Sequence, residues 1–89
     1  HYAVALSYSM EPGVAPKVVA KGKNYVAQRI KKIALQSGVP VIERKPLARA
    51  LFASVNVGAE IPYDLYHAVA ELLAYVYKIK GKKVRKKNS

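Results

Sequence analysis

Large and small side chains alternate strictly along residues 2–8, and this pattern limits the folds open to the chain more than any other feature. One face carries Tyr2, Val4, Leu6 and Tyr8, and the other carries Ala3, Ala5 and Ser7. A period of two residues is typical of a β-strand. Because both faces are largely apolar, we predict an interior strand with a helix packed closely over the small face.

The rest of the chain predicts two more strands and three helices. β-branched side chains predict strands over residues 16–20 and 39–42. Apolar residues at helical spacing predict helices over residues 22–37, 47–54 and from Pro62 to about residue 80. Gly38 is expected to end the first helix as a C-cap. Together these segments predict an α/β fold in which a small mixed β-sheet packs against helices.

The charge balance favours an anionic partner. The 89 residues include 16 Lys and Arg against 5 Asp and Glu, and the net charge is +11. Five of the basic residues lie in residues 81–89, which we predict to be a basic flexible tail following a single domain over residues 1–80. The chain has no cysteine, which excludes disulfides and thiolate metal sites. A start at His1 without an initiator methionine indicates a piece of a longer protein.

Residues suited to catalysis are few. Glu60, Asp64, His67 and Glu71 fall near one face of the last predicted helix, a spacing that can bring an imidazole beside a carboxylate. A solvated helix face with acidic groups near its N-terminus explains the same residues, and we prefer this interpretation to a catalytic or metal site. The seven tyrosines are interpreted mainly as core or rim packing.

Five segments, in unbroken order, resemble the FlhB/YscU family of export-switch proteins of bacterial type III secretion, and most closely its flagellar branch. They are residues 1–6, 15–22, 38–41 and 46–51, and residues 61–62 together with 68–71. Ordered agreement in five places is more specific than any single motif. The resemblance covers the chain to about residue 80 and leaves the basic tail unmatched.

The resemblance implies a component of the bacterial flagellar protein export apparatus. Such proteins bind export substrates and switch specificity from rod and hook type to filament type. They cut themselves once between Asn and Pro of an Asn-Pro-Thr-His motif, of which His1 would be the last residue, with an accessory role in the cleavage. Because this reaction is intramolecular and occurs once, the chain is not expected to be an enzyme, and neither a cofactor nor a metal is expected.

The resemblance also implies partners and a location. The expected partners are the upstream N-terminal half of the same protein, export substrates, a length-control protein and other export-gate membrane proteins, with no nucleic acid. The expected location is the cytoplasmic face of the bacterial inner membrane. We predict that a strand of the upstream half pairs beside residues 2–8. We predict a shallow apolar substrate-binding patch at Ala15, Pro16, Ala70 and Leu73, although the last two could instead belong to the core.

A different class of function remains open at this point. Small RNA-binding modules of the L7Ae/L30e-like kind are also basic and α/β, and they also carry a helix followed by Gly-Val-Pro-Val, as at residues 38–41. This alternative agrees with the net charge. It matches one segment of the chain, whereas the export-switch resemblance matches five.

Overall fold

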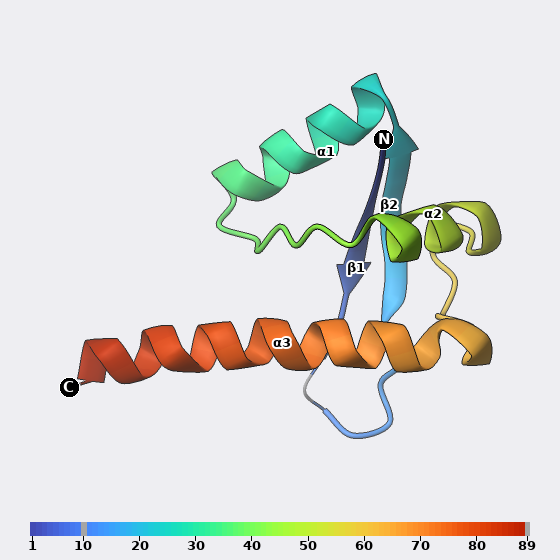
Figure 1. Cartoon of the computed structure of the whole chain (residues 1–89). Helices are drawn as coiled ribbons and strands as arrows, with labels where there is room; N and C mark the ends of the chain where they lie inside the picture. The colour runs from blue at the N-terminus through green and yellow to red at the C-terminus, as the bar shows by residue number, and fades with distance from the viewer. Residues whose placement is uncertain (10, 89) are drawn as a thin grey trace.

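The chain forms two strands followed by three helices (Figure 1). The structure is a computed structural model that describes residues 1–9 and 11–88, with side chains as far as Lys80. The elements are β1 (Tyr2–Ser7), β2 (Lys17–Lys23), α1 (Tyr25–Gln36), α2 (Lys45–Ser54) and α3 (Tyr63–Asn88). No helix in the described part of the chain is long and apolar enough to cross a bilayer.

Strands β1 and β2 pair antiparallel, with Ala3 opposite Gly22 and a register shift between Ala5 and Leu6. The other edge of β2 is occupied as well, because it exchanges backbone hydrogen bonds with the segment before α3. Gly58 N donates to Val18 O at 2.6 Å, and Val18 N donates to Ala59 O at 3.1 Å. Within the described residues β1 pairs with β2 alone, so its outer edge is free of backbone partners.

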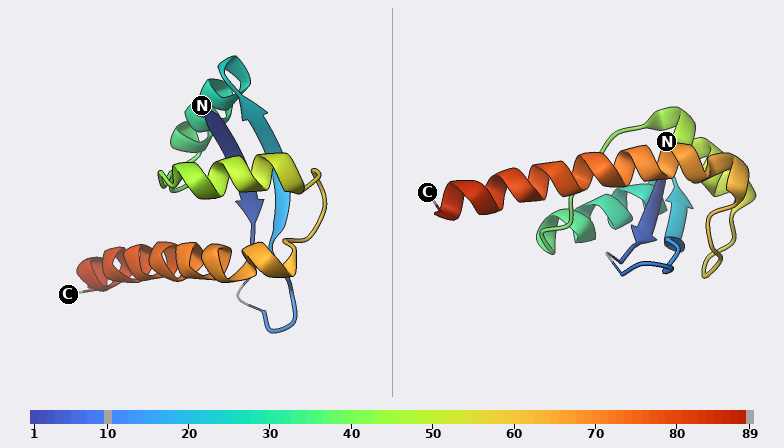
Figure 2. Two further views of the ribbon diagram at one scale, coloured as in Figure 1. Left: turned by 45° about the vertical axis from the view of Figure 1, so that its right-hand side comes forward. Right: turned by 90° about the horizontal axis from the view of Figure 1, so that it is seen from below.

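Helices cover both faces of the sheet (Figure 2). On the face with large side chains, the Tyr2 ring lies 4.9 Å from the Phe52 ring of α2. On the small face, a Cβ added to Gly22 would lie 2.7 Å from the Cβ of Val26, so α1 approaches the backbone of β2 closely. This contact confirms the predicted helix over the small side chains of the first strand.

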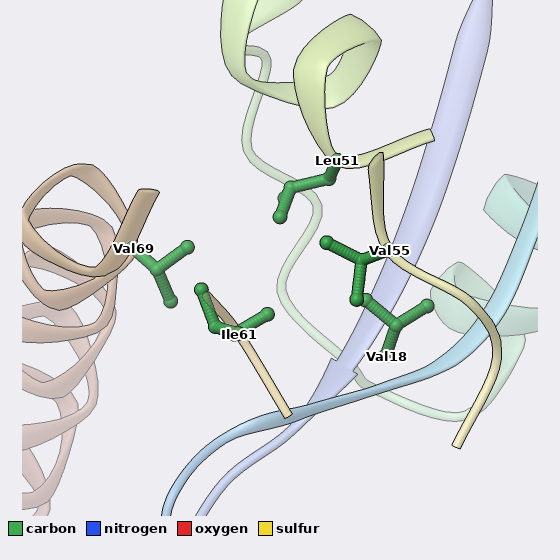
Figure 3. Close-up of a cluster of buried hydrophobic side chains, with 5 residues drawn as sticks. All are labelled: Val18, Leu51, Val55, Ile61 and Val69. Atoms are coloured by element: carbon green, nitrogen blue, oxygen red, sulfur yellow. The ribbon is translucent and has the colours of Figure 1, made fainter. Parts of the chain in front are cut away.

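The main core lies on the α2 side of the sheet (Figure 3). Its fully or nearly buried members come from β2, α2 and α3 and from the segments that join them. They are Val18, Leu51, Val55, Ile61 and Val69. Each side chain of this size contributes roughly 1.5–3 kcal/mol when it is taken out of water. The cluster therefore fixes α2 and α3 against the sheet.

Several predicted boundaries are confirmed. Gly38 follows α1 with φ 73°, and Val39 N donates to Ala34 O at 2.9 Å, as expected of a glycine that ends a helix. Pro46 lies in the first turn of α2, and Pro62 directly precedes α3. The expected helix start at residue 22 is wrong, because β2 continues through Lys23 and α1 begins at Tyr25.

The predicted third strand is wrong. Residues 39–42 form no strand, and among the described residues the sheet is a two-stranded antiparallel pair rather than a mixed one. The segment has β-branched side chains but no partner strand, and Pro40 has no N–H to donate. The α/β class itself is confirmed. Helix α3 runs to Asn88, while the side chains of the predicted tail, residues 81–89, lie outside the described ones, so its flexibility stays a prediction.

Candidate functional site

An apolar groove of about 320 Å³ lies between α3 and the loop that joins β1 to β2. The loop side contributes Tyr8, Ser9, Val14 and Pro16. The helix side contributes Tyr66, Ala70, Leu73, Ala74 and Tyr77. Three tyrosines thus line the groove together with small and aliphatic side chains, a lining suited to binding another apolar segment.

The groove exists because α3 carries two adjacent apolar rows. The row that includes Val69 and Val76 is buried, with 0% and 6% of these residues exposed, and it attaches the helix to the protein. The neighbouring row starts at Tyr66 and continues through Ala70 at a spacing of four residues, which keeps both on one side of the helix. Ala70 is exposed, whereas Leu73 is half-buried and also packs against the core.

The opposite wall is a turn with its own hydrogen bonds. Gly13 adopts φ 83°, a conformation that favours glycine, and Val14 N donates to Glu11 O at 3.3 Å. The Ser9 hydroxyl accepts a bond from Glu11 N at 3.1 Å. Beyond this turn Pro16 is buried and leads directly into β2. The fold therefore holds the wall at both of its ends.

A lysine reaches the tyrosine on the loop side of the groove. Lys80 Nζ of α3 donates to the hydroxyl of Tyr8 at 3.3 Å and lies 5.8 Å from the centroid of the same ring. This link joins the end of β1 to α3 across residues far apart in the sequence. The groove thus combines apolar contact area with a cation beside it, and its lining residues include no Cys, His or carboxylate side chain that could act as a nucleophile or general base.

The structure brings together three of the four predicted substrate-binding residues. Pro16, Ala70 and Leu73 line the groove, while Ala15 is half-buried and is not among the lining side chains. Tyr8 was interpreted from the sequence as a packing residue, whereas in the structure it lines the groove. The repeat from Tyr66 through Ala70 to Tyr77 contained the signal, because it marks a second apolar row on the helix. Substrate binding itself stays a prediction.

His1 lies at the other end of β1 from the groove. The residue is exposed, and its carbonyl accepts a hydrogen bond from Asn24 N at 2.9 Å. Its imidazole makes no hydrogen bond or ion pair with the described residues. The backbone of His1 therefore continues the β1–β2 pairing, and its role in cleavage stays a prediction.

The acidic face of α3 is solvated. His67 Nε2 and Glu71 Oε2 are 3.7 Å apart, and the two side chains are 88% and 71% exposed. An ion pair in water contributes little to stability or to chemistry. This finding agrees with the interpretation as a solvated helix face.

Comparison with known proteins places the chain in a family. The model of the FlhB HrpN YscU SpaS family matches residues 1–76. The flagellar biosynthetic protein FlhB of Escherichia coli (strain K12) is 51% identical over 80 residues, which is 90% of this chain and 21% of that protein. The chain thus spans about one-fifth of the length of this curated relative.

Solved structures agree with the sequence match. The cytoplasmic domain of FlhB from Shewanella putrefaciens has a TM-score of 0.80 and 40% identity, over 86% of this chain and 62% of that one. The PscU C-terminal domain has a TM-score of 0.81 and 39% identity, over 85% of this chain and 96% of that one. The fold and the sequence therefore lead to one conclusion: this chain belongs to the FlhB HrpN YscU SpaS family.

Proposed function

We propose that the chain is the C-terminal cytoplasmic fragment of a protein of the bacterial flagellar export apparatus. It binds export substrates and switches their specificity from rod and hook type to filament type after Asn-Pro self-cleavage. One observation carries the proposal: in a member of this family, Pro16, Ala70 and Leu73 meet in a single apolar groove. The fragment acts at the cytoplasmic face of the inner membrane.

The groove suits a short, extended, apolar segment of a substrate. Ala70 and Ala74 are small, so the backbone of a ligand can approach α3 closely. Tyr8 and Tyr66 add rigid aromatic area with hydroxyls that can reach water. Burial of apolar surface contributes about 25 cal/mol per Å², and the costs of association offset part of this gain. A groove of about 320 Å³ therefore favours a weak contact that is made and released repeatedly during export.

Ala70→Asp tests substrate binding with little risk to the fold. Ala70 is exposed, so an added carboxylate enters the groove and not the core, whereas a substitution at Leu73 would also disturb core packing. The matched control is Ala53→Asp, an exposed alanine of α2 that does not line the groove. The ligand is the N-terminal segment of a hook-type export substrate from the same bacterium, titrated calorimetrically.

We expect Ala70→Asp to weaken this binding at least about tenfold, because a carboxylate loses water without gaining a partner. Ala53→Asp should bind like the parent chain. Circular dichroism checks that both variants remain folded. If the two variants bind equally well, the groove is not the substrate site.

The upstream half of the protein is proposed to pair with β1. Because Asn24 N donates to His1 O, Tyr2 and Lys23 form a pair whose own N–H groups point away from each other. The N–H groups of Tyr2 and Val4 therefore face the free edge of β1 and have no backbone partner among the described residues.

Hydrogen exchange tests this pairing. The amides of Tyr2 and Val4 should exchange rapidly in the isolated chain and at least about tenfold more slowly when the upstream half is bound, as a hydrogen-bonded strand requires. The amide of Ala3, which faces β2, serves as the internal control. Equal exchange of Tyr2 and Val4 in both samples would contradict the proposed strand.

Self-cleavage and switching need the full-length parent. Mass spectrometry should detect a C-terminal fragment that starts at the motif's Pro, two residues before His1, and replacement of the motif's Asn by Ala should abolish this fragment. Cells carrying that variant should export hook-type substrates without changing to filament type. Continued switching without cleavage would overturn this part of the proposal. The length-control protein and the other export-gate membrane proteins are the proposed partners in this change.

Family membership favours this function over the RNA-binding alternative. The family model matches residues 1–76, which include the Gly-Val-Pro-Val segment on which the RNA-binding hypothesis rests. The groove is also apolar, whereas RNA phosphates are bound by basic and polar groups. Tight, steeply salt-dependent binding of structured RNA would favour the alternative.

A further inference from the structure

A cation lies at one end of the groove. Lys80 lies three residues beyond Tyr77, which lines the groove from α3, and this spacing is about 4.5 Å along the helix axis. Its Nζ donates to the hydroxyl of Tyr8 on the opposite wall at 3.3 Å. A segment that lies along the groove therefore passes beside this ammonium.

Among the described side chains, neither α3 nor the facing loop gives Lys80 a carboxylate partner. Side chains three or four residues apart are neighbours on a helix. For Lys80 these positions hold Val76, Tyr77, Lys83 and Val84. The one ion pair in the described part of the chain joins His67 to Glu71, so Glu11 of the loop makes none with Lys80. The ammonium is bonded to a neutral phenol, although it can donate three hydrogen bonds.

We propose that Lys80 makes the groove selective for apolar segments that carry an acidic residue at one end. The inference rests on the proposed substrate groove and names the class of segment that this groove prefers. A carboxylate at the end of the segment accepts a charge-assisted hydrogen bond from Nζ, which is stronger than a bond to a neutral hydroxyl. The apolar part of the same segment covers the lining side chains, so one ligand makes both contacts.

The position of a carboxylate along the groove decides its effect. Residue 70 lies about 15 Å from residue 80 along the helix axis, and the lining side chains include no Lys or Arg. A carboxylate there loses water and gains no partner, which is the basis of the Ala70→Asp test. Lys80 is exposed, so a carboxylate beside it keeps part of its water and gains a cation. The groove thus disfavours acids in its middle and favours one at its Lys80 end.

Matched peptides test this preference. The N-terminal segment of a hook-type export substrate is extended by one Asp or one Asn, at its N-terminal or its C-terminal end. The two ends cover both directions in which the segment can lie. All four peptides are acetylated and amidated, so that the pairs differ only in the added side chain. In calorimetric titrations of the parent chain we expect the Asp peptide of one pair to bind about fivefold more tightly than its Asn partner, the upper range for a partly exposed ion pair.

Lys80→Gln separates this cation from the general charge of the chain. The control is Lys78→Gln, which removes the same charge from an exposed residue of the same helix that points in a different direction. We expect the preference for Asp to vanish in Lys80→Gln and to persist in Lys78→Gln, with both variants folded by circular dichroism. Equal losses of preference would assign it to the net charge of +11 and overturn the proposal. Equal weakening of the Asp and Asn peptides by Lys80→Gln would also overturn it, because Lys80 would then act only by holding Tyr8.

The same titrations distinguish this selectivity from the proposed function. If all four peptides bind the parent chain with equal affinity, the groove remains the substrate site and the selectivity is refuted. If none of them binds, the groove is not the substrate site, and the selectivity falls with it.

Discussion

Lys21 is predicted to stabilise the junction between the sheet and α2. Its side chain leaves β2 on the α2 side, and Nζ donates to Phe52 O and to Val55 O, each at 2.9 Å. The ammonium also lies 5.2 Å from the centroid of the Phe52 ring. The last carbonyls of a helix have no partner within the helix, and they carry the negative end of its dipole. Lys21 therefore satisfies one such carbonyl and places a positive charge where α2 favours it.

Lys21→Met retains the aliphatic stem and removes the ammonium. A hydrogen bond that involves a charged group contributes about 1.5–3 kcal/mol, but here one partly buried ammonium makes both bonds and regains water when unfolded. We therefore expect a loss of about 2 kcal/mol in the free energy of unfolding. For a domain of this size the melting temperature should fall by roughly 8–16 °C. Urea unfolding followed by far-UV circular dichroism measures the loss directly.

Lys23→Met is the matched control, because Lys23 lies on the same strand and is exposed. It removes the same charge from a chain of net charge +11 and introduces the same side chain into β2. We expect a change within about 0.5 kcal/mol, as at most surface positions. Equal urea midpoints for the two variants would refute the role given to the contacts of Lys21 with α2.

Two further substitutions test the packing on the two faces of the sheet. Gly22→Ala should destabilise the chain by about 1–3 kcal/mol, because the new Cβ meets Val26 of α1, and Val26→Ala in the same chain should restore part of the loss. Leu51→Ala should cost about 2–5 kcal/mol through the cavity left in the core, whereas the exposed Leu35→Ala should cost far less, as urea unfolding will show.

The sequence correctly predicted those strands and helix ends that depend on residues close together in the chain. The alternation at residues 2–8 predicted both the strand and the close helix over its small face, because side-chain size limits how near two backbones can come. Gly38 and Pro46 marked helix ends through their own conformational preferences. Gly22 was misassigned to the helix, since a glycine needed for close packing looks in sequence like one that ends a strand.

The features that depend on distant residues were harder to predict. The composition of residues 39–42 favours a strand, but a strand also needs a neighbour, and no local pattern shows whether one is present. The groove joins a loop near residue 14 to a helix face near residue 70. Small and apolar side chains indicated Pro16, Ala70 and Leu73, whereas Tyr8 emerged as a member of the groove only when the two segments were seen together.

The free edge of β1 and the groove can be changed independently. A strand added beside β1 would lie in the plane of the sheet and would bond to the outward N–H groups of Tyr2 and Val4. It would not displace the core cluster, which lies on the α2 side of the sheet. It would also not enter the groove, whose walls are the β1–β2 loop and α3. A Pro substitution at Val4 removes one outward donor together with a side chain that packs against the core, so circular dichroism must first show that this variant remains folded. The folded variant should then show weaker association of the two halves, while Ala70→Asp should weaken substrate binding alone. If each substitution impaired both activities equally, the edge and the groove would have to be parts of one binding surface.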